Sequence, residues 1–179
     1  QRGADPIGIC LHVPEVPRKA GSARFLANMF RTGIRNANGQ DIVSSIHFSV
    51  DSNEVVQSIP MNEIAIHARS NSTATEPQGY ANTNLIGIEI MGRHSYTRQK
   101  WLEDGGRQME LTGQLIAGIC RLYGIPARRL FPGEVLAPHR GICTHLDVTE
   151  AFRVRGGHVD PNAALFPFDV LFEYINQYT

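Results

Sequence analysis

A chain of 179 residues is long enough to form one domain with a sizeable hydrophobic core, and 42% of its residues are hydrophobic. Lysine and arginine together number 17, as do aspartate and glutamate, so the chain lacks the basic excess that nucleic-acid-binding proteins carry. Three widely spaced cysteines do not suit a disulfide-rich scaffold, and no apolar run reaches the length of a transmembrane helix.

Strand and helix signals alternate along the first half of the chain. Residues 6–13 form a short apolar run suited to a β-strand. Apolar residues then recur at helical spacing from residue 22 until Asn38-Gly39, which predicts a helix over this stretch. Residues 44–60 alternate on either side of a polar turn and predict a hairpin. The polar stretch 68–84 is too long for a plain connection and favours a functional loop.

The second half continues the mixture of strands and helices. Residues 85–91 predict a strand, and residues 106–126 predict a long helix that ends at Gly124 and Pro126. A short buried strand ends at Cys143, and residues 168–178 predict a final amphipathic helix. We therefore expect an α/β fold with a central mixed β-sheet flanked by helices, because a tight hairpin cannot join parallel strands.

Three of the predicted strands share a pattern in which one face is aliphatic and the other has a single ionisable side chain beside small residues. The ionisable residues are His12, His47 and Glu89. A plain solvent-exposed face would instead have scattered polar side chains, so the pattern favours a lined cleft on one face of the sheet. The residues assigned to the aliphatic face are Ile7, Ile9, Leu11, Ile46, Phe48, Val50, Ile86, Ile88 and Ile90.

The segment GICTHLDVTEAFRVRGGHVDPN, residues 141–162, brings two histidines and two aspartates together as His145, Asp147, His158 and Asp160. Such residues are common in loops, but imidazole and carboxylate are also metal ligands, and two ligands often come from one short stretch. A third ligand from elsewhere would complete a site. His12, on the ionisable face of a distant strand, is the candidate.

These residues lie in stretches that resemble the zinc-dependent N-acetylmuramoyl-L-alanine amidases, the type 2 amidases shared with phage endolysins and peptidoglycan recognition proteins. The matching stretches are GICLHV, SSIHFSVDSNEVVQSIPMNEIAIHA, NLIGIEIMG and THLDV…HVDPNAALFPF, in the family's order. The spacing before HVDP is most similar to amidase domains from phages of actinobacteria. The resemblance implies a peptidoglycan recognition protein-like fold, and one amidase catalytic domain over residues 1–179 that belongs to a longer lysin.

The resemblance also implies a role for each site residue. His12, His145 and Asp160 are expected to bind Zn²⁺, and Glu89 is expected to act as the catalytic glutamate. His158 stands where many relatives have a lysine that stabilises the transition state. Three departures from the family pattern are expected on the cleft wall: Ile46 replaces a tyrosine found in some relatives, Ile66 replaces a common tryptophan and Arg69 replaces a glycine.

The implied reaction is zinc-dependent hydrolysis of the amide bond between N-acetylmuramic acid and L-alanine in bacterial peptidoglycan, for phage-mediated host lysis. The expected partner is the cell wall, with no nucleic acid and no membrane insertion, and the protein is expected to be a monomer. The N-terminus lacks the layout of a signal peptide, so we expect synthesis in the host cytoplasm and action on the wall. Two alternatives stay open: a non-catalytic peptidoglycan-binding module, and a cysteine peptidase that uses Cys143.

The remaining ionisable residues have structural interpretations. His47 is expected to be a hydrogen-bonded histidine near the site, and Asp147 to orient His145 or its loop. His67 either lines the cleft or caps a loop. His94 and His139 lie in polar surroundings and are expected at the surface.

Overall fold

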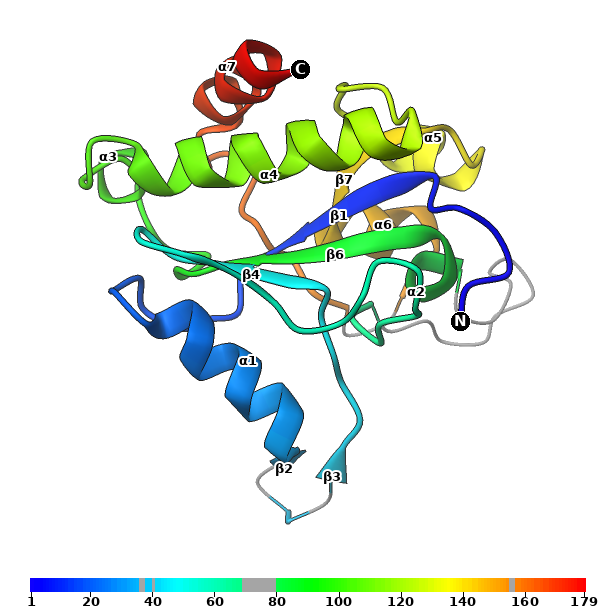
Figure 1. The fold of residues 1–179 in the computed structure, drawn as a ribbon, viewed down its shortest axis with the longest axis horizontal. Helices are drawn as coiled ribbons and strands as arrows, with labels where there is room; N and C mark the ends of the chain where they lie inside the picture. Colours follow the sequence, from blue (N-terminus) through cyan, green and yellow to red (C-terminus); the bar gives the residue numbers. More distant parts are fainter. Residues whose placement is uncertain (36–37, 40, 69–79, 155–156) are drawn as a thin grey trace.

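The computed structural model describes residues 1–35, 38–39, 41–68, 80–154 and 157–179, and its centre is a five-stranded sheet (Figure 1). The strand order is β5-β4-β6-β1-β7. The sheet is mixed, as the sequence predicts: four strands run parallel to their neighbours and β5 is antiparallel to β4. The strands are β1 Gly8–His12, β4 Phe48–Val50, β5 Val55–Gln57, β6 Leu85–Ile90 and β7 Gly141–Thr144, and a separate pair comprises β2 Ile34–Arg35 and β3 Asp41–Ile42.

The aliphatic face of the sheet forms the main core. Helix α4 (Arg107–Tyr123) lies across this face, with α7 (Phe168–Tyr178) packed beside it, and Figure 1 shows both on the same side of the strands. The short helix α3 (Arg98–Trp101) contributes Trp101 to the same core. The strand residues in this core are Ile9, Leu11, Phe48, Val50, Ile86, Ile88, Ile90 and Ile142.

The opposite face of the sheet is covered at its two ends. Helix α1 (Ser22–Thr32) packs over the β4–β5 end, on the side of the sheet away from α4 (Figure 1). Helix α6 (His145–Ala151) packs over β1 and β7, next to α5 (Pro132–Leu136), while α2 (Tyr80–Asn84) leads directly into β6. The carboxyl ends of the middle strands therefore lie between two helical coverings.

Two expectations about the first half of the chain need correction. The first helix ends at Thr32, because Gly33 adopts a positive φ of 89° that stops the helical backbone. Ile46 does not share the aliphatic face with Phe48. It lies on the opposite face against Gly87, where its Cδ1 is 2.6 Å from the place a Gly87 Cβ would occupy. Strand β4 begins only at Phe48, so the two-residue alternation does not extend back to Ile46.

The sequence analysis also missed short helices. Residues 145–151, interpreted as part of a polar segment, form α6 because the Thr144 hydroxyl caps the helix and Asp147 completes a capping box. The predicted loop 68–84 contains α2 at its end, and its residues 69–79 lie outside the described part of the chain. The long helix and the final helix are confirmed as α4 and α7. Among the described residues, no helix is both long and apolar enough to cross a membrane.

Candidate metal site and catalytic cleft

Three site residues gather at the carboxyl ends of adjacent parallel strands. His12 is the last residue of β1, and it pairs in register with Glu89 on β6. His145 follows β7 directly and begins α6. Ligands of open α/β sheets bind at this edge, where the chain leaves each strand and its side chains meet those of neighbouring strands.

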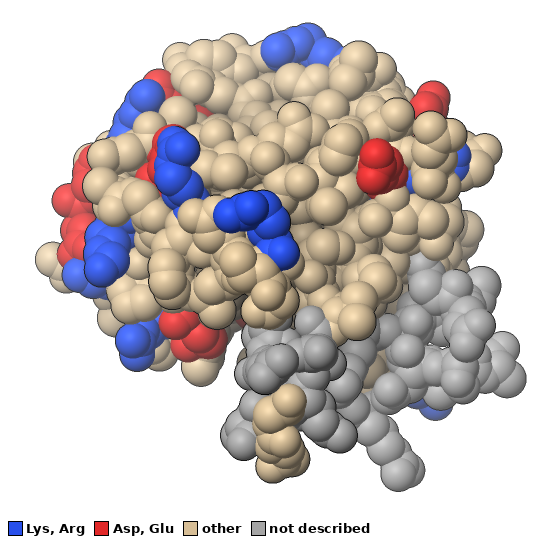
Figure 2. All heavy atoms as spheres, turned by 60° about the horizontal axis from the view of Figure 1, so that its bottom comes forward, with Lys and Arg blue, Asp and Glu red and all other residues tan. Residues whose placement is uncertain are grey.

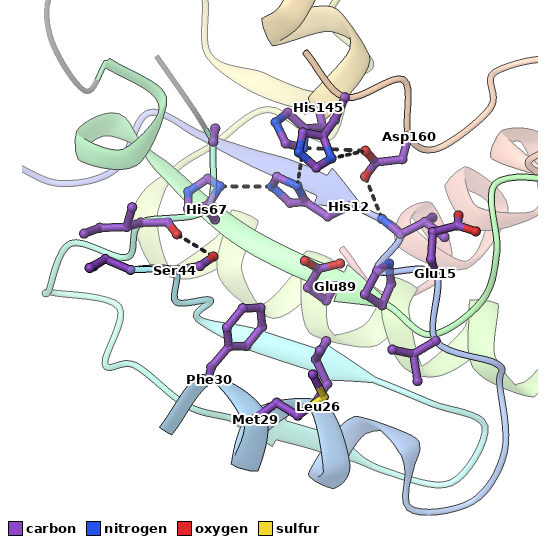
Figure 3. Close-up of a pocket in the computed structure, with 17 residues that line it drawn as sticks. His12, Glu15, Leu26, Met29, Phe30, Ser44, His67, Glu89, His145 and Asp160 are labelled. Atoms are coloured by element: carbon purple, nitrogen blue, oxygen red, sulfur yellow. Dashed lines mark hydrogen bonds and ion pairs between the residues drawn. The ribbon is translucent and has the colours of Figure 1, made fainter. Parts of the chain in front are cut away.

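His12, His145 and Asp160 form a compact set of potential metal ligands (Figure 3). The Nδ1 atoms of His12 and His145 are 2.9 Å apart, and His145 Nδ1 is 3.6 Å from Asp160 Oδ1. The donor atoms of all three lie within 4.8 Å of one another, and all three residues are buried. Two imidazoles and a carboxylate are ligands that catalytic zinc sites use, so the donor set fits a metal ion.

Backbone contacts hold Asp160 in this position. Its Oδ2 accepts a hydrogen bond of 2.8 Å from the Val13 N–H, just beyond the end of β1. Its carbonyl accepts from the Leu146 N–H at 3.1 Å, in the first turn of α6. The loop that carries Asp160 is therefore tied to the elements that carry both histidines, while Oδ1 stays directed toward His145.

Asp147 builds the start of α6 and does not belong to the donor set. Its Oδ2 accepts from the Thr144 backbone N–H at 2.6 Å and from the Thr144 hydroxyl, and it pairs with Arg129 at 2.6 Å. These contacts place the first residue of the helix, which is His145. The expectation that Asp147 orients His145 or its surroundings is met through the backbone.

Glu89 points into the cleft beside His12 (Figure 3). Burial raises the pKa of its carboxyl well above the usual value, and the nearby Asp160 charge raises it further. Its Oε2 is buried and has no hydrogen-bond partner among the described residues. A buried, unpaired carboxyl oxygen next to a potential metal site is poised to exchange a proton with a substrate or a water.

His67 lines the cleft and contacts His12 directly, which decides between the two interpretations left open for this residue. Its Nδ1 is 2.9 Å from His12 Nε2, and its Nε2 is 3.4 Å from the Leu85 carbonyl oxygen. Burial lowers the pKa of both His12 and His67 well below the usual value, so both imidazoles are neutral. The sequence pattern alone did not indicate this contact, because His67 lies outside any strand or helix.

His47 is a structural histidine, as expected. Its Nδ1 accepts a 3.0 Å hydrogen bond from the Gly87 N–H, and burial lowers its pKa to about 4. It faces the ring of His67, with ring centroids 5.9 Å apart. His94 and His139 are exposed, as the sequence analysis expected, and neither lines the cleft.

His158 covers the outer side of the donor set. Its ring stacks on His145 with centroids 4.4 Å apart and planes within 9°, and its Nδ1 is 3.5 Å from Asp160 Oδ1. The side chain is 61% exposed, in contrast to the buried histidines beneath it. This position leaves His158 at the boundary between the site and the solvent.

A second group of donors overlaps the first, because Cys10, His12 and His67 also lie close together. Cys10 packs in an apolar cluster with Cys143 and does not itself line the cleft. Burial and the neighbouring Cys143 raise the pKa of the Cys10 thiol well above its usual value. A thiolate is the form that binds metals, so the His–His–Asp group fits a metal ion better. Cys143 is buried in β7, which disfavours the cysteine peptidase alternative.

The cleft in front of these residues has a volume of about 480 Å³. One wall contains the polar site, and the other is apolar, formed by Leu26, Met29 and Phe30 of α1 (Figure 3). Figure 2 shows charged side chains of both signs gathered mainly at the left of the face that it displays, with others at the top, in the centre and at the right. Most of the described surface in this view belongs to residues other than lysine, arginine, aspartate and glutamate.

The fold is a mixed sheet with helices on both faces, and one cleft at the carboxyl ends of its parallel strands contains His12, Glu89, His145 and the loop residue Asp160. The sequence matches the N-acetylmuramoyl-L-alanine amidase family over residues 2–163, and the chain belongs to this family. It is therefore an enzyme that hydrolyses the amide bond between N-acetylmuramic acid and L-alanine in peptidoglycan.

Solved structures with the same fold include the Staphylococcus aureus hydrolase AmiA in complex with its ligand, with a TM-score of 0.63 and 19% identity over 97% of this chain and 73% of that one. The structure of an AmpD derivative has a TM-score of 0.62 and 16% sequence identity, and the match covers 96% of this chain and 86% of that one. A mutant endolysin from Bacillus subtilis has a TM-score of 0.61 and 20% sequence identity, and the match covers 96% of this chain and 86% of that one. Comparison with curated protein sequences finds no match.

Proposed function

We propose that this amidase uses one zinc ion held by His12, His145 and Asp160. The observation that carries the proposal is the convergence of three buried donor atoms from three separate segments, all within 4.8 Å. Three protein ligands leave a tetrahedral metal one open position, the pattern of catalytic zinc sites. When bound, zinc supplies a Lewis acid that activates water and polarises the carbonyl of the amide.

The second part of the proposal assigns the proton transfers to Glu89. Its carboxylate accepts a proton from the attacking water and passes it to the nitrogen of the leaving L-alanine. Burial raises the pKa of Glu89 well above its usual value, and a raised pKa favours a carboxyl group that serves first as base and then as acid. The orphaned Oε2 supports this role, because a purely structural carboxylate is normally satisfied by hydrogen bonds.

His158 is proposed to stabilise the negative charge that develops on the carbonyl oxygen. It reaches the cleft from above His145 without belonging to the group of buried donors. An imidazole N–H directed at the oxyanion would supply the hydrogen bond that the family resemblance implies for a lysine at this position.

We also propose that residues 1–179 form one catalytic domain of a phage lysin, a monomer that is made in the host cytoplasm and cleaves the bacterial wall. The family match supports a cell-wall substrate, and one structural neighbour is an endolysin. The alternative, a non-catalytic peptidoglycan-binding module, is disfavoured because Glu89 and the whole donor set are present in one cleft.

Digestion of purified cell walls tests the proposal. We expect the protein to release free L-alanine amino termini without new reducing sugar ends. His12→Ala, His145→Ala and Asp160→Ala should each lose bound zinc and activity together. Stoichiometric zinc in His12→Ala, measured by elemental analysis, would show that the metal site lies elsewhere. Undiminished wall binding without any release of amino termini would favour the binding-module alternative.

A further inference from the structure

Three neighbouring groups form a hydrogen-bonded chain behind the donor set. The Leu85 carbonyl oxygen is 3.4 Å from His67 Nε2, and His67 Nδ1 is 2.9 Å from His12 Nε2. The other nitrogen of His12, Nδ1, faces His145 and lies in the group with Asp160. The chain therefore runs from a backbone carbonyl to the atom that would bind the metal.

The carbonyl sets the direction of every hydrogen bond in this chain. A carbonyl oxygen can only accept, so His67 Nε2 carries the proton. A neutral imidazole has one N–H, so His67 Nδ1 has a lone pair and accepts from His12 Nε2–H. The proton of His12 is then on Nε2, and its Nδ1 presents a lone pair toward His145 and Asp160. The opposite direction would place two lone pairs against each other at the Leu85 end.

We propose that His67 is a positioning residue that holds His12 in the tautomer and orientation required for a metal at Nδ1. This inference rests on the zinc site of the proposed function and adds a residue that does not itself touch the metal. Partners of metal-bound histidines commonly orient the ring and increase its basicity through the second nitrogen. Here the partner is another imidazole. The Leu85 carbonyl of β6 fixes which nitrogen of that imidazole carries the proton.

The surroundings of His67 hold its ring rigidly. Its backbone N–H donates to Asn82 Oδ1 at 2.8 Å, and the Ala68 N–H donates to the same oxygen at 2.8 Å. The ring packs on Gly87, where an added Cβ would come within 2.7 Å of His67 Cγ. The sheet has a glycine at the position that this ring contacts, so the close packing leaves His67 little freedom to turn away from His12.

Nuclear magnetic resonance of the zinc-loaded protein with ¹⁵N-labelled histidine tests the direction of the chain. We expect His67 to be protonated at Nε2 alone, with a scalar coupling between His67 Nδ1 and His12 Nε2 across their hydrogen bond. Protonation of His67 at Nδ1 would overturn the proposal. This measurement needs no variant, so it decides the matter even if substitutions prevent folding.

Zinc affinity, measured by competition with a chelator, tests the consequence. His67→Phe keeps an aromatic ring without an acceptor, and we expect affinity to fall about tenfold to a hundredfold. His67→Asn places an amide oxygen near the position of Nδ1, so it should retain affinity within a few fold. His47→Asn is the matched control, because His47 is buried beside His67 and is not hydrogen-bonded to His12.

Three results of this experiment would contradict the inference. Wild-type affinity in His67→Phe, or an equal loss in His67→Phe and His67→Asn, would show that the acceptor is unimportant. Two zinc ions in the wild type and one in His67→Phe would make His67 a ligand of a second site with Cys10. If the proposed zinc site is itself wrong, a different result shows it, because His12→Ala would then keep its metal.

Discussion

Five of the seven histidines form one connected cluster through their rings, from His47 through His67, His12 and His145 to His158. Burial lowers the pKa of the first four, to about 4 in the cases of His47 and His145. Neutral imidazoles can pack together without charge repulsion, and the neutral form is the one that binds metals. The cluster is therefore compatible with a folded protein both before and after a metal binds.

Glu89→Gln should keep the fold and the metal but lose most of the amidase activity. Glutamine has nearly the same shape as glutamate but cannot accept and return a proton. General acid–base groups typically contribute about a hundredfold to ten-thousandfold, so we expect a loss of this size in the turnover of a soluble muramyl peptide. Activity within a few fold of the wild type, with zinc retained, would assign Glu89 a structural role.

The same substitution should also change how stability depends on pH in the metal-free protein. The pKa of Glu89 is raised in the folded state from a usual value of 4.5. A raised carboxyl pKa means that stability is fully present below pH 4.5 and decreases as the pH rises toward the folded pKa. Glu89→Gln should therefore have a higher Tm than the wild type at neutral pH and an equal Tm near pH 4. Thermal unfolding across this range measures the difference, and an equal Tm at neutral pH would contradict the burial of a charge.

His158→Ala should retain zinc and the fold while losing activity. The side chain is 61% exposed and stacks on His145, so its removal leaves the buried donors in place. An oxyanion-stabilising donor typically contributes about a hundredfold to a thousandfold, which sets the expected fall in kcat. Elemental analysis together with steady-state kinetics checks the prediction. Loss of the metal in this variant would show that His158 is a ligand.

At the scale of elements, the site depends on where strands end and helices begin. His12 is the last residue of β1, and His145 is the first residue of α6. A capping-box signal for α6 is present in the sequence THLD, where Thr144 and Asp147 are three residues apart. The helix could have been predicted from this signal, but its seven residues are too few for a clear apolar period.

Helix α4 offers a matched pair of glycines that tests its packing against α7. A Cβ on Gly113 would come within 2.5 Å of Tyr174 Cβ and 3.1 Å of the Ile175 backbone nitrogen, whereas a Cβ on Gly118 meets nothing within 4 Å. Gly113→Ala should destabilise the protein by about 1–3 kcal/mol, because the two helices must separate. Gly118→Ala should stabilise it by up to about 1 kcal/mol through helix propensity. Chemical denaturation measures both, and stabilisation by Gly113→Ala would contradict the close contact.

At the scale of the whole molecule, the proposed ligands connect segments that are far apart in sequence. β1, the start of α6 and the loop before α7 each supply one ligand. A metal that binds only the folded state stabilises it by mass action. Chelation should therefore lower the Tm, and added zinc should restore it. Asp160→Ala is the control, since its Tm should not respond to either treatment. An unchanged wild-type Tm would argue against a metal shared by these three segments.

The sequence by itself determined the mixed sheet, its two chemically different faces and the residues that approach one another in the cleft. Side-chain alternation on a strand is local, so Gly8–His12 and Leu85–Ile90 display their faces directly in the order of their residues. The same reasoning failed at Ile46, because the alternation applies only where the backbone is in a regular strand.

Only the tertiary structure decided which side chains of the histidine cluster contact one another and through which atoms. The contact between His67 and His12 spans 55 positions, and the Val13–Asp160 hydrogen bond spans 147. Such contacts depend on the parallel register of β1 with β6 and β7 and on the path of the loops between elements. No local pattern encodes these distances, because they result from the packing of the whole chain. For the same physical reason, the direction of the hydrogen bonds from Leu85 to His12 could be inferred only after the fold was known.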